Sequence, residues 1–369
     1  MERGKTLKPN LSSITVLTLQ LAAATLAGIA AFLLDIPGDW LLGPLLIGVL
    51  ATLNPDKAQP LPPSLATAAQ VIIALGTAAS FSLSTLFQAA HYTLAMLMCI
   101  VLTGGLCLGK GYLLWRWAGI DIKTGFLGSI PGAGHSIVAM SEEMGADALA
   151  VAVFQYLRIL LVLILIPLLA GYFFPVDSVS VNVPSVITHQ FSLTEFSVNL
   201  ALLTLLGALG VLGGRWLRLP QAVFIGPLLT GLLAFWFFPY PLYLPKLVLN
   251  IGLLLLGLSI GLKFNWQAAQ KLIKAVLIEL ILVIILILGC LGVGYEFHWL
   301  TGVDLITALL GSTPGGLMAV MAATIQLGGD SGLVLGMQMS RMFLILLITP
   351  WLASFLLKTP QKVDEDFSE

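Results

Sequence analysis

The chain has 369 residues, of which 58% are hydrophobic and only 9% are charged. Soluble globular domains carry roughly 25% charged residues, so this composition excludes a soluble globule and predicts a polytopic membrane protein. The net charge of −1 gives no sign of a nucleic-acid partner. The three cysteines have no histidine at ligand spacing, so neither a disulfide framework nor a metal site is predicted.

Membrane helices are predicted from the apolar runs in chain order. The polar, basic tail at residues 1–13 precedes an apolar run that continues past signal-peptide length, which indicates a retained first span. Crossing a hydrocarbon core of about 30 Å takes about 20 helical residues. The predicted spans are 14–34, 39–54, 64–82, 89–115, 148–174, 194–214, 222–238, 245–262, 272–295 and 331–357. An outside linker is expected at 175–193 and a solvated tail at 358–369.

The last five spans repeat the first five. Pro131 and Pro314 stand 183 positions apart, and the same shift, without a gap, superposes the marked residues of the two halves. It places Gly43-Pro44-Leu45-Leu46 on Gly226-Pro227-Leu228-Leu229, Asp147 on Asp330, Gln155 on Gln338 and Arg158 on Arg341. The duplication predicts two transmembrane repeats, residues 14–174 and 194–357.

Each repeat contains one apolar segment that a proline interrupts, at 122–145 and at 305–328. Proline removes a backbone donor and glycine favours non-helical dihedral angles, so each segment is predicted to be a broken helix or a re-entrant hairpin. If the segment re-enters, Lys and Arg fall in the predicted inside loops and none falls outside, with both termini cytoplasmic. Five crossings per half would then invert one repeat relative to the other. Twelve crossings with two parallel halves is the alternative.

The expected fold is therefore an all-α polytopic membrane protein with two inverted repeats, each of five transmembrane helices plus one broken or re-entrant helix. Interrupted helices in inverted repeats are typical of a midplane transport site, because such backbone is tolerated only where it lines a cavity. Helices that restart after the turns present free N–H groups and a positive dipole end, which favour an anion. The turn residues predicted to bind substrate are Ser129, Pro131, Gly132, Gly134, Ser136, Ser312, Thr313, Pro314, Gly315 and Gly316. In the alternative interpretation, proline and glycine only permit tight packing.

Two arginines complete the predicted substrate site. Arg158 and Arg341 lie about ten residues into their spans, roughly 15 Å deep. A central arginine costs about 2.5–3.5 kcal/mol on the lenient insertion scale, so it is expected to face a cavity or a partner. Gln155 and Gln338 lie one turn earlier and could bind the same ligand. The alternative is structural: Arg158 and Arg341 would bind the carbonyl ends of the broken helices, without contacting substrate.

Three acidic residues are candidates for ion coupling. Asp147 and Asp330 precede the arginine helices, where an aspartate is most simply an N-cap. Glu279 stands within a predicted span, and it could neutralise an arginine or carry a proton. Lys110 is expected near an inner membrane end, with its ammonium group reaching the interface.

The doubled Gly-Pro-Leu-Leu-x-Gly segments, Gly-Ser-x-Pro-Gly turns and Gln-x-x-Arg helices resemble the bacterial membrane AbrB family over nearly the whole chain. The hallmark of that family is this internal duplication. The resemblance implies the bacterial inner membrane and a distant likeness to inverted-repeat antiporter and anion transporter folds. The paired acidic residues of the antiporters are not evident here, which argues against sodium/proton exchange. Family members are described as regulators of AidB expression or as ammonia monooxygenases.

Two functions fit the sequence and a third is disfavoured. The leading hypothesis is a secondary transporter of a small organic anion, with a proton or cation as coupling ion. The second is a membrane regulator or sensor that affects gene expression without binding DNA, because no extramembrane segment is long enough to fold. An oxygenase is disfavoured, since His91, His135, His189 and His298 are scattered without ligand spacing. We therefore expect no enzyme, cofactor, metal or nucleic acid; the expected partners are lipid and a small molecule, and a homo-oligomer stays open.

Overall fold

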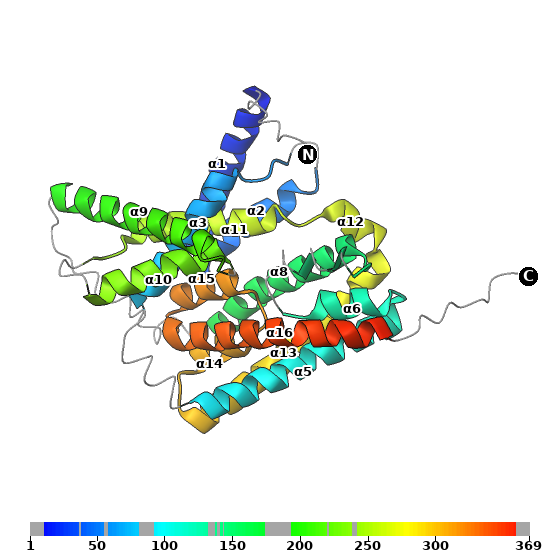
Figure 1. Cartoon of the computed structure of the whole chain (residues 1–369). Coiled ribbons are helices and arrows are strands. Elements are labelled where there is room, and N and C mark those ends of the chain that lie inside the picture. The colour runs from blue at the N-terminus through cyan, green and yellow to red at the C-terminus, as the bar shows by residue number, and fades with distance from the viewer. Residues whose placement is uncertain are drawn as a thin grey trace, which may run out of the picture.

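The structure is a computed structural model in which the chain is described over most of its length. The described residues are 11–36, 38–54, 58–80, 92–131, 137–138, 141–142, 144–173, 193–219, 221–237 and 242–358. Within these ranges the regular structure is helical and no strand occurs (Figure 1). The all-α prediction is therefore confirmed for this part of the chain.

A helix lies at each of the ten predicted spans. In chain order they are α1 (Leu11–Leu33), α2 (Asp39–Ala51), α3 (Pro63–Ser80), α5 (Thr93–Ala118), α8 (Ala148–Phe173), α9 (Leu193–Trp216), α10 (Ala222–Phe237), α11 (Lys246–Gly261), α13 (Ile273–Thr301) and α16 (Ser331–Lys358). A short helix, α12 (Trp266–Lys271), lies between α11 and α13. Among the described residues, seven helical segments are long and apolar enough to cross a membrane. This supports a multi-pass membrane protein, while the inner-membrane location and the cytoplasmic termini stay predictions.

Both proline-containing segments interrupt a helix. α6 (Ile122–Ser129) ends before Pro131, and α14 (Leu305–Ser312) ends before Pro314. Ile130 and Thr313 have extended backbone, with ψ of 123° and 134°, because the ring of a following proline disfavours the helical region. In the second half a new helix, α15 (Leu317–Leu327), starts after the turn. Gly132, Gly134 and Ser136 lie outside the described residues.

The helices form two bundles, and each bundle takes helices from both repeats. The first bundle contains α1–α3 with α9–α11, and the second contains α5, α6 and α8 with α13–α16 (Figure 1). In the first bundle, α2 packs against α11 and α3 against α10, so the contacts repeat when the halves are exchanged. In the second bundle, α5 packs against α13. α6 packs against α8, and in the same way α14 packs against α16. The bundles meet mainly where α3 touches α15 and α16 and where α11 touches α8.

The repeated Gly-Pro segments bring neighbouring helices into close contact. A Cβ atom on Gly43 of α2 would lie 2.6 Å from the carbonyl oxygen of Ala27 in α1. A Cβ on Gly226 of α10 would clash with the carbonyl oxygen of Gly210 in α9. Real Cβ atoms do not approach this closely, so both crossings require glycine. Small residues at membrane helix interfaces have this role in general.

We therefore expect Gly226→Ala to destabilise the protein by about 1–3 kcal/mol or more, because the added methyl group must push α9 and α10 apart. The matched control is Gly213→Ala on α9, where a Cβ would meet nothing within 4 Å. Alanine is the better helix former by about 0.8–1 kcal/mol, so the control should be neutral or stabilising. Thermal unfolding in detergent measures both, and equal midpoints for the two variants would contradict the crossing geometry.

Candidate functional site

An aspartate caps each broken helix at its start. Asp121 accepts a hydrogen bond from the backbone N of Thr124 at 2.9 Å, and Asp304 accepts one from the backbone N of Thr307 at 3.1 Å. The hydroxyl oxygens of these threonines accept from the backbone N of Asp147 and Asp330, at 2.9 and 2.8 Å. The two halves therefore build the same connection between the half-helix and the arginine helix.

Asp147 and Asp330 themselves occupy N-cap positions. The Asp147 side chain accepts from the backbone N of Ala150 at 3.0 Å, and the Asp330 side chain accepts from that of Leu333 at 3.1 Å. Each carboxylate thus satisfies a backbone donor at the start of α8 or α16. The structure supports the structural interpretation of these two aspartates, and their coupling role stays a prediction.

A glutamine replaces the backbone donor that proline lacks. In an unbroken helix the carbonyl of Leu127 would accept from residue 131, which is a proline and has no N–H. Instead the side-chain Nε2 of Gln155 donates to the carbonyl oxygens of Leu127, at 2.9 Å, and Ile130, at 3.0 Å. The second half repeats this arrangement: Nε2 of Gln338 donates to Leu310, at 3.1 Å, and to Thr313, at 3.0 Å.

The arginines bind the same helix ends. Nη1 of Arg158 donates to the carbonyl of Ser129 at 3.0 Å, and Nη2 donates to Oε1 of Gln155 at 2.7 Å. Nη1 of Arg341 donates to Ser312 at 3.2 Å and Nη2 to Thr313 at 3.0 Å, with a further bond from Nη2 to Gln338. A cation at a helix C-terminus is favourable because the dipole there is negative. Each arginine is thus held by its own half, as the structural alternative expected.

Donor capacity nevertheless remains in the first half. Nε of Arg158 and Oγ of Ser129 are both buried and have no hydrogen-bond partner among the described residues. Oγ of Ser312, the equivalent of Ser129, instead donates to the carbonyl of Leu309 at 2.9 Å. The two halves therefore cap their broken helices in the same way and differ in which buried donors lack a partner among the described residues.

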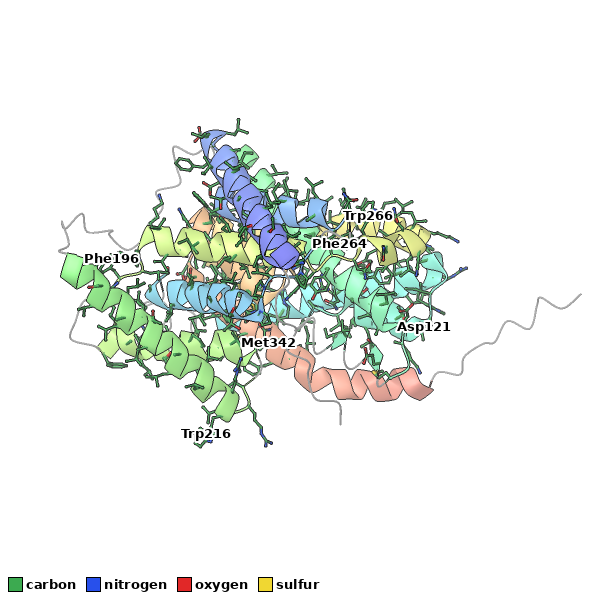
Figure 2. All side chains as sticks on the ribbon, turned by 90° about the horizontal axis from the view of Figure 1, so that it is seen from above. Asp121, Phe196, Trp216, Phe264, Trp266 and Met342 are labelled. Atoms are coloured by element: carbon green, nitrogen blue, oxygen red, sulfur yellow. The ribbon has the colours of Figure 1, made fainter. Side chains whose placement is uncertain are left out.

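The turn of the second half lies against the arginine helix of the first. A Cβ on Gly315 would lie 2.6 Å from Cγ1 of Val162, and one on Gly316 would lie 3.5 Å from Cδ1 of Ile159. Ile159 is the next residue after Arg158 on α8. The start of α15 thus packs against α8, the helix that carries Arg158, and Pro131 and Pro314 are buried in their turns. Met342, next to Arg341, lies near the middle of the view in Figure 2, whereas Asp121 lies toward one end.

Four charged side chains are buried among the described residues: Lys110, Arg158, Glu279 and Arg341. All four are 4% exposed or less, and they lie on α5, α8, α13 and α16. Arg158 lies within electrostatic range of Glu279 and of Arg341. The group contains three cations and one carboxylate, so it holds a surplus of two positive charges.

Lys110 corrects one expectation, because its side chain lies inside the second bundle. Its ammonium group does not reach the interface; it forms a buried ion pair with Glu279 of α13. The reason is that α5 packs against α13, which turns this face of α5 inward. Glu279 is therefore neutralised by Lys110 and not by an arginine. The sequence signal that could have revealed this buried pair is a lysine in the middle of a helix that carries no acidic residue.

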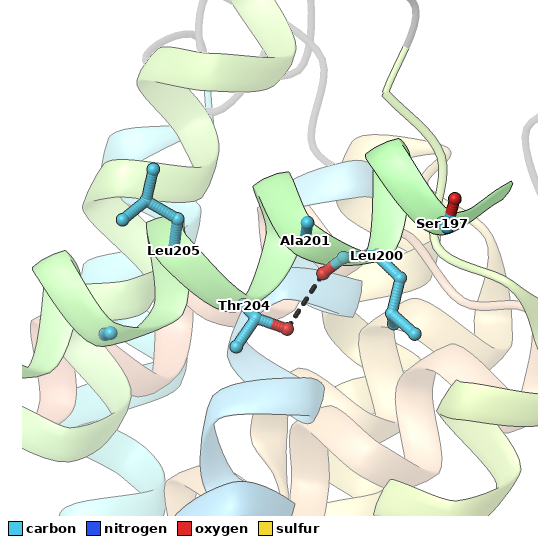
Figure 3. A pocket seen from close by; sticks show the side chains of 6 residues that line it. Ser197, Leu200, Ala201, Thr204 and Leu205 are labelled. Carbon is cyan, nitrogen blue, oxygen red and sulfur yellow. Dashed lines mark hydrogen bonds between the residues drawn. The ribbon is translucent and has the colours of Figure 1, made fainter. Parts of the chain in front are cut away.

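A surface hollow on α9 does not coincide with this site (Figure 3). It has a volume of about 610 Å³ and is lined by Ser197, Leu200, Ala201, Thr204, Leu205 and Ala208. All six residues belong to one helix and most are apolar. The Thr204 hydroxyl donates to the carbonyl of Leu200 at 2.8 Å, within the same helix. The hollow contains none of the predicted site residues.

We expect Gln155→Leu to lower the free energy of unfolding by about 1–3 kcal/mol, because two buried carbonyls lose their donor. Gln338→Leu should show a smaller loss, since Arg341 still donates to the Thr313 carbonyl. Gln270→Leu on the exposed face of α12 is the control and should stay within about 0.5 kcal/mol. Thermal or denaturant unfolding in detergent gives all three values. A loss for Gln155→Leu no larger than that of the control would refute the cap.

The comparisons with known proteins agree with the resemblance. The model of a family described as "Transition state regulatory protein AbrB" matches residues 40–357. The chain is 30% identical over 348 residues to "Putative regulator AbrB" of Escherichia coli (strain K12), covering 93% of this chain and 95% of that protein. It is 23% identical over 347 residues to "Uncharacterized protein YhjN" of Bacillus subtilis (strain 168), covering 86% and 88%. The chain belongs to the AbrB family.

Proposed function

We propose that this protein is a secondary transporter of a small organic anion, which binds where the second proline turn packs against α8, the helix that carries Arg158. The observation that carries the proposal is the surplus of two buried positive charges. The C-terminal ends of α6 and α14 each supply roughly half a negative charge to their arginine. About one positive charge then remains that no described residue compensates. Buried charge is expensive in a membrane protein unless it is paired, so an anionic ligand is the natural partner.

Two features favour a carboxylate. Nε of Arg158 and Oγ of Ser129 are donors that no described residue satisfies, and a carboxylate oxygen accepts such donors well. α15 begins beside α8, so its first N–H groups and its positive dipole end add to the same preference. The proposed site takes its donors from both repeats.

The two bundles suggest how the site reaches both sides of the membrane. The proposed site belongs to the bundle of α5, α6, α8 and α13–α16, which touches the other bundle through α3 and α11. We infer that this bundle shifts against the α1–α3 and α9–α11 bundle, as transporter repeats move around a fixed site. Inverted repeats, an inner-membrane location and cytoplasmic termini belong to this proposal, which involves no enzymatic step.

The first test is uptake into liposomes that contain the purified protein. The panel consists of radiolabelled lactate, succinate and citrate as anions, with glycine and choline as compounds without net negative charge. We expect saturable uptake of at least one carboxylate above protein-free liposomes and none of choline. Choline uptake, or no carboxylate uptake at all, would overturn the proposal.

Ser129→Ala tests the binding site without disturbing the caps. Because Oγ of Ser129 has no partner in the described protein, its removal should leave the unfolding midpoint unchanged. If the hydroxyl binds substrate, KM for uptake should rise roughly fivefold to tenfold, the value of about one hydrogen bond. Ser312→Ala is the matched control, since that hydroxyl is already bonded within its helix, and its KM should not change. Equal KM values for both variants and the wild type would show that the Ser129 hydroxyl does not bind substrate.

A second candidate function, a membrane regulator or sensor without DNA binding, is favoured by the name of the Escherichia coli relative. Deleting the gene and profiling transcripts and intracellular metabolites separates the two. Transport predicts that an organic anion accumulates or is depleted before transcripts change. A transcript change without any metabolite change would favour sensing.

A further inference from the structure

The Lys110–Glu279 ion pair is buried between two helices of the second bundle. Lys110 lies on α5 and Glu279 on α13, and the pair joins the only buried lysine and the only buried carboxylate of the described residues. Oε2 of Glu279 is buried and has no hydrogen-bond partner in the described part of the chain. The carboxylate therefore has a free lone-pair site that could accept a proton.

The other half of the protein shows that packing does not require these charges. The 183-residue shift places Lys110 on Val293 and Glu279 on Met96. Val293 of α13 packs against the buried cluster that contains Met96 of α5. The equivalent place in the α5–α13 contact is thus filled by apolar side chains. Since replacing a buried ion pair by well-packed apolar residues is often neutral or stabilising, stability alone is a weak reason for the pair.

The surroundings of the pair connect it to the proposed substrate site. The described charged or titratable groups that act on it are Cys107 of α5 and Arg158 of α8. Arg158 also carries the Nε donor of the proposed substrate site, which no described residue satisfies. A change of charge at Glu279 is therefore felt where the anion would bind.

We propose that Glu279, opposed by Lys110, is the proton-binding site that couples proton movement to anion transport in the same direction. This inference rests on the proposed function. When the ion pair opens toward one side, one proton adds to a carboxylate oxygen of Glu279, while Lys110 keeps its own proton. The buried surplus rises from two to three positive charges, which strengthens anion binding. By linkage the bound anion favours the proton equally. On the other side the anion leaves, Glu279 releases its proton, and the pair forms again.

The test is a double variant that copies the apolar pair of the other half, Lys110→Val with Glu279→Met. It removes one charge of each sign, so the surplus held by the two arginines stays. Wild type and variant are reconstituted in liposomes, and uptake of labelled lactate, succinate and citrate is measured with the outside at the same pH as the inside or more acidic. We expect the acidic outside to raise wild-type uptake about tenfold. In the double variant the anion should still exchange across the membrane, without any effect of the pH gradient.

Three further outcomes decide the inference. Gradient-driven uptake that persists in the double variant overturns the coupling role and leaves the transporter proposal intact. Wild-type uptake that does not depend on the pH gradient also overturns the coupling role and leaves the transporter proposal intact. Absence of any anion uptake by the wild type overturns both proposals. If the double variant does not fold, Glu279→Gln replaces it: it keeps the shape of the protonated side chain, and its uptake should be independent of the gradient.

Discussion

The structure depends on satisfying the backbone where a proline breaks a helix inside the membrane. Lipid offers no hydrogen bonds, so each carbonyl that loses its helical donor needs another one. The amide of Gln155 takes the place of the N–H that Pro131 lacks, and the guanidinium of Arg158 binds the carbonyl of Ser129. The second half repeats this with Gln338 and Arg341. This is why glutamine and arginine, both costly in a membrane, occur as a pair one turn apart.

The same solution leaves more buried positive charge than the described groups of the protein neutralise. A helix end carries only a fraction of a charge, whereas each arginine carries a full one. An arginine used as a cap therefore also makes the interior attractive to an anion. In the proposed transporter Arg158 would serve both roles, because its Nη atoms bind the cap while no described residue satisfies its Nε atom.

Duplication makes the differences between the halves informative. The two halves share their caps, their glycine crossings and their helix order, so these features belong to the fold. At a few equivalent positions the two halves differ, and their common fold does not explain these differences. The Ser129 hydroxyl has no partner among the described residues, whereas that of Ser312 is bonded, and an ion pair stands where the other half has Val293 and Met96. We interpret both departures as marks of function.

The sequence by itself determined the ten helices, the two breaks and the pairing of residues across the repeats. These properties are local: apolar length sets a helix, proline ends one, and a constant shift reveals a copy. Only the tertiary structure decided that each bundle mixes the repeats, that Arg158 and Arg341 bind carbonyls of their own half, and that Glu279 pairs with Lys110. The physical reason is that a partner depends on which face of a helix turns toward which neighbour. An almost uniformly apolar membrane helix does not encode that face in its periodicity, so Lys110 could not be placed before α5 was seen against α13.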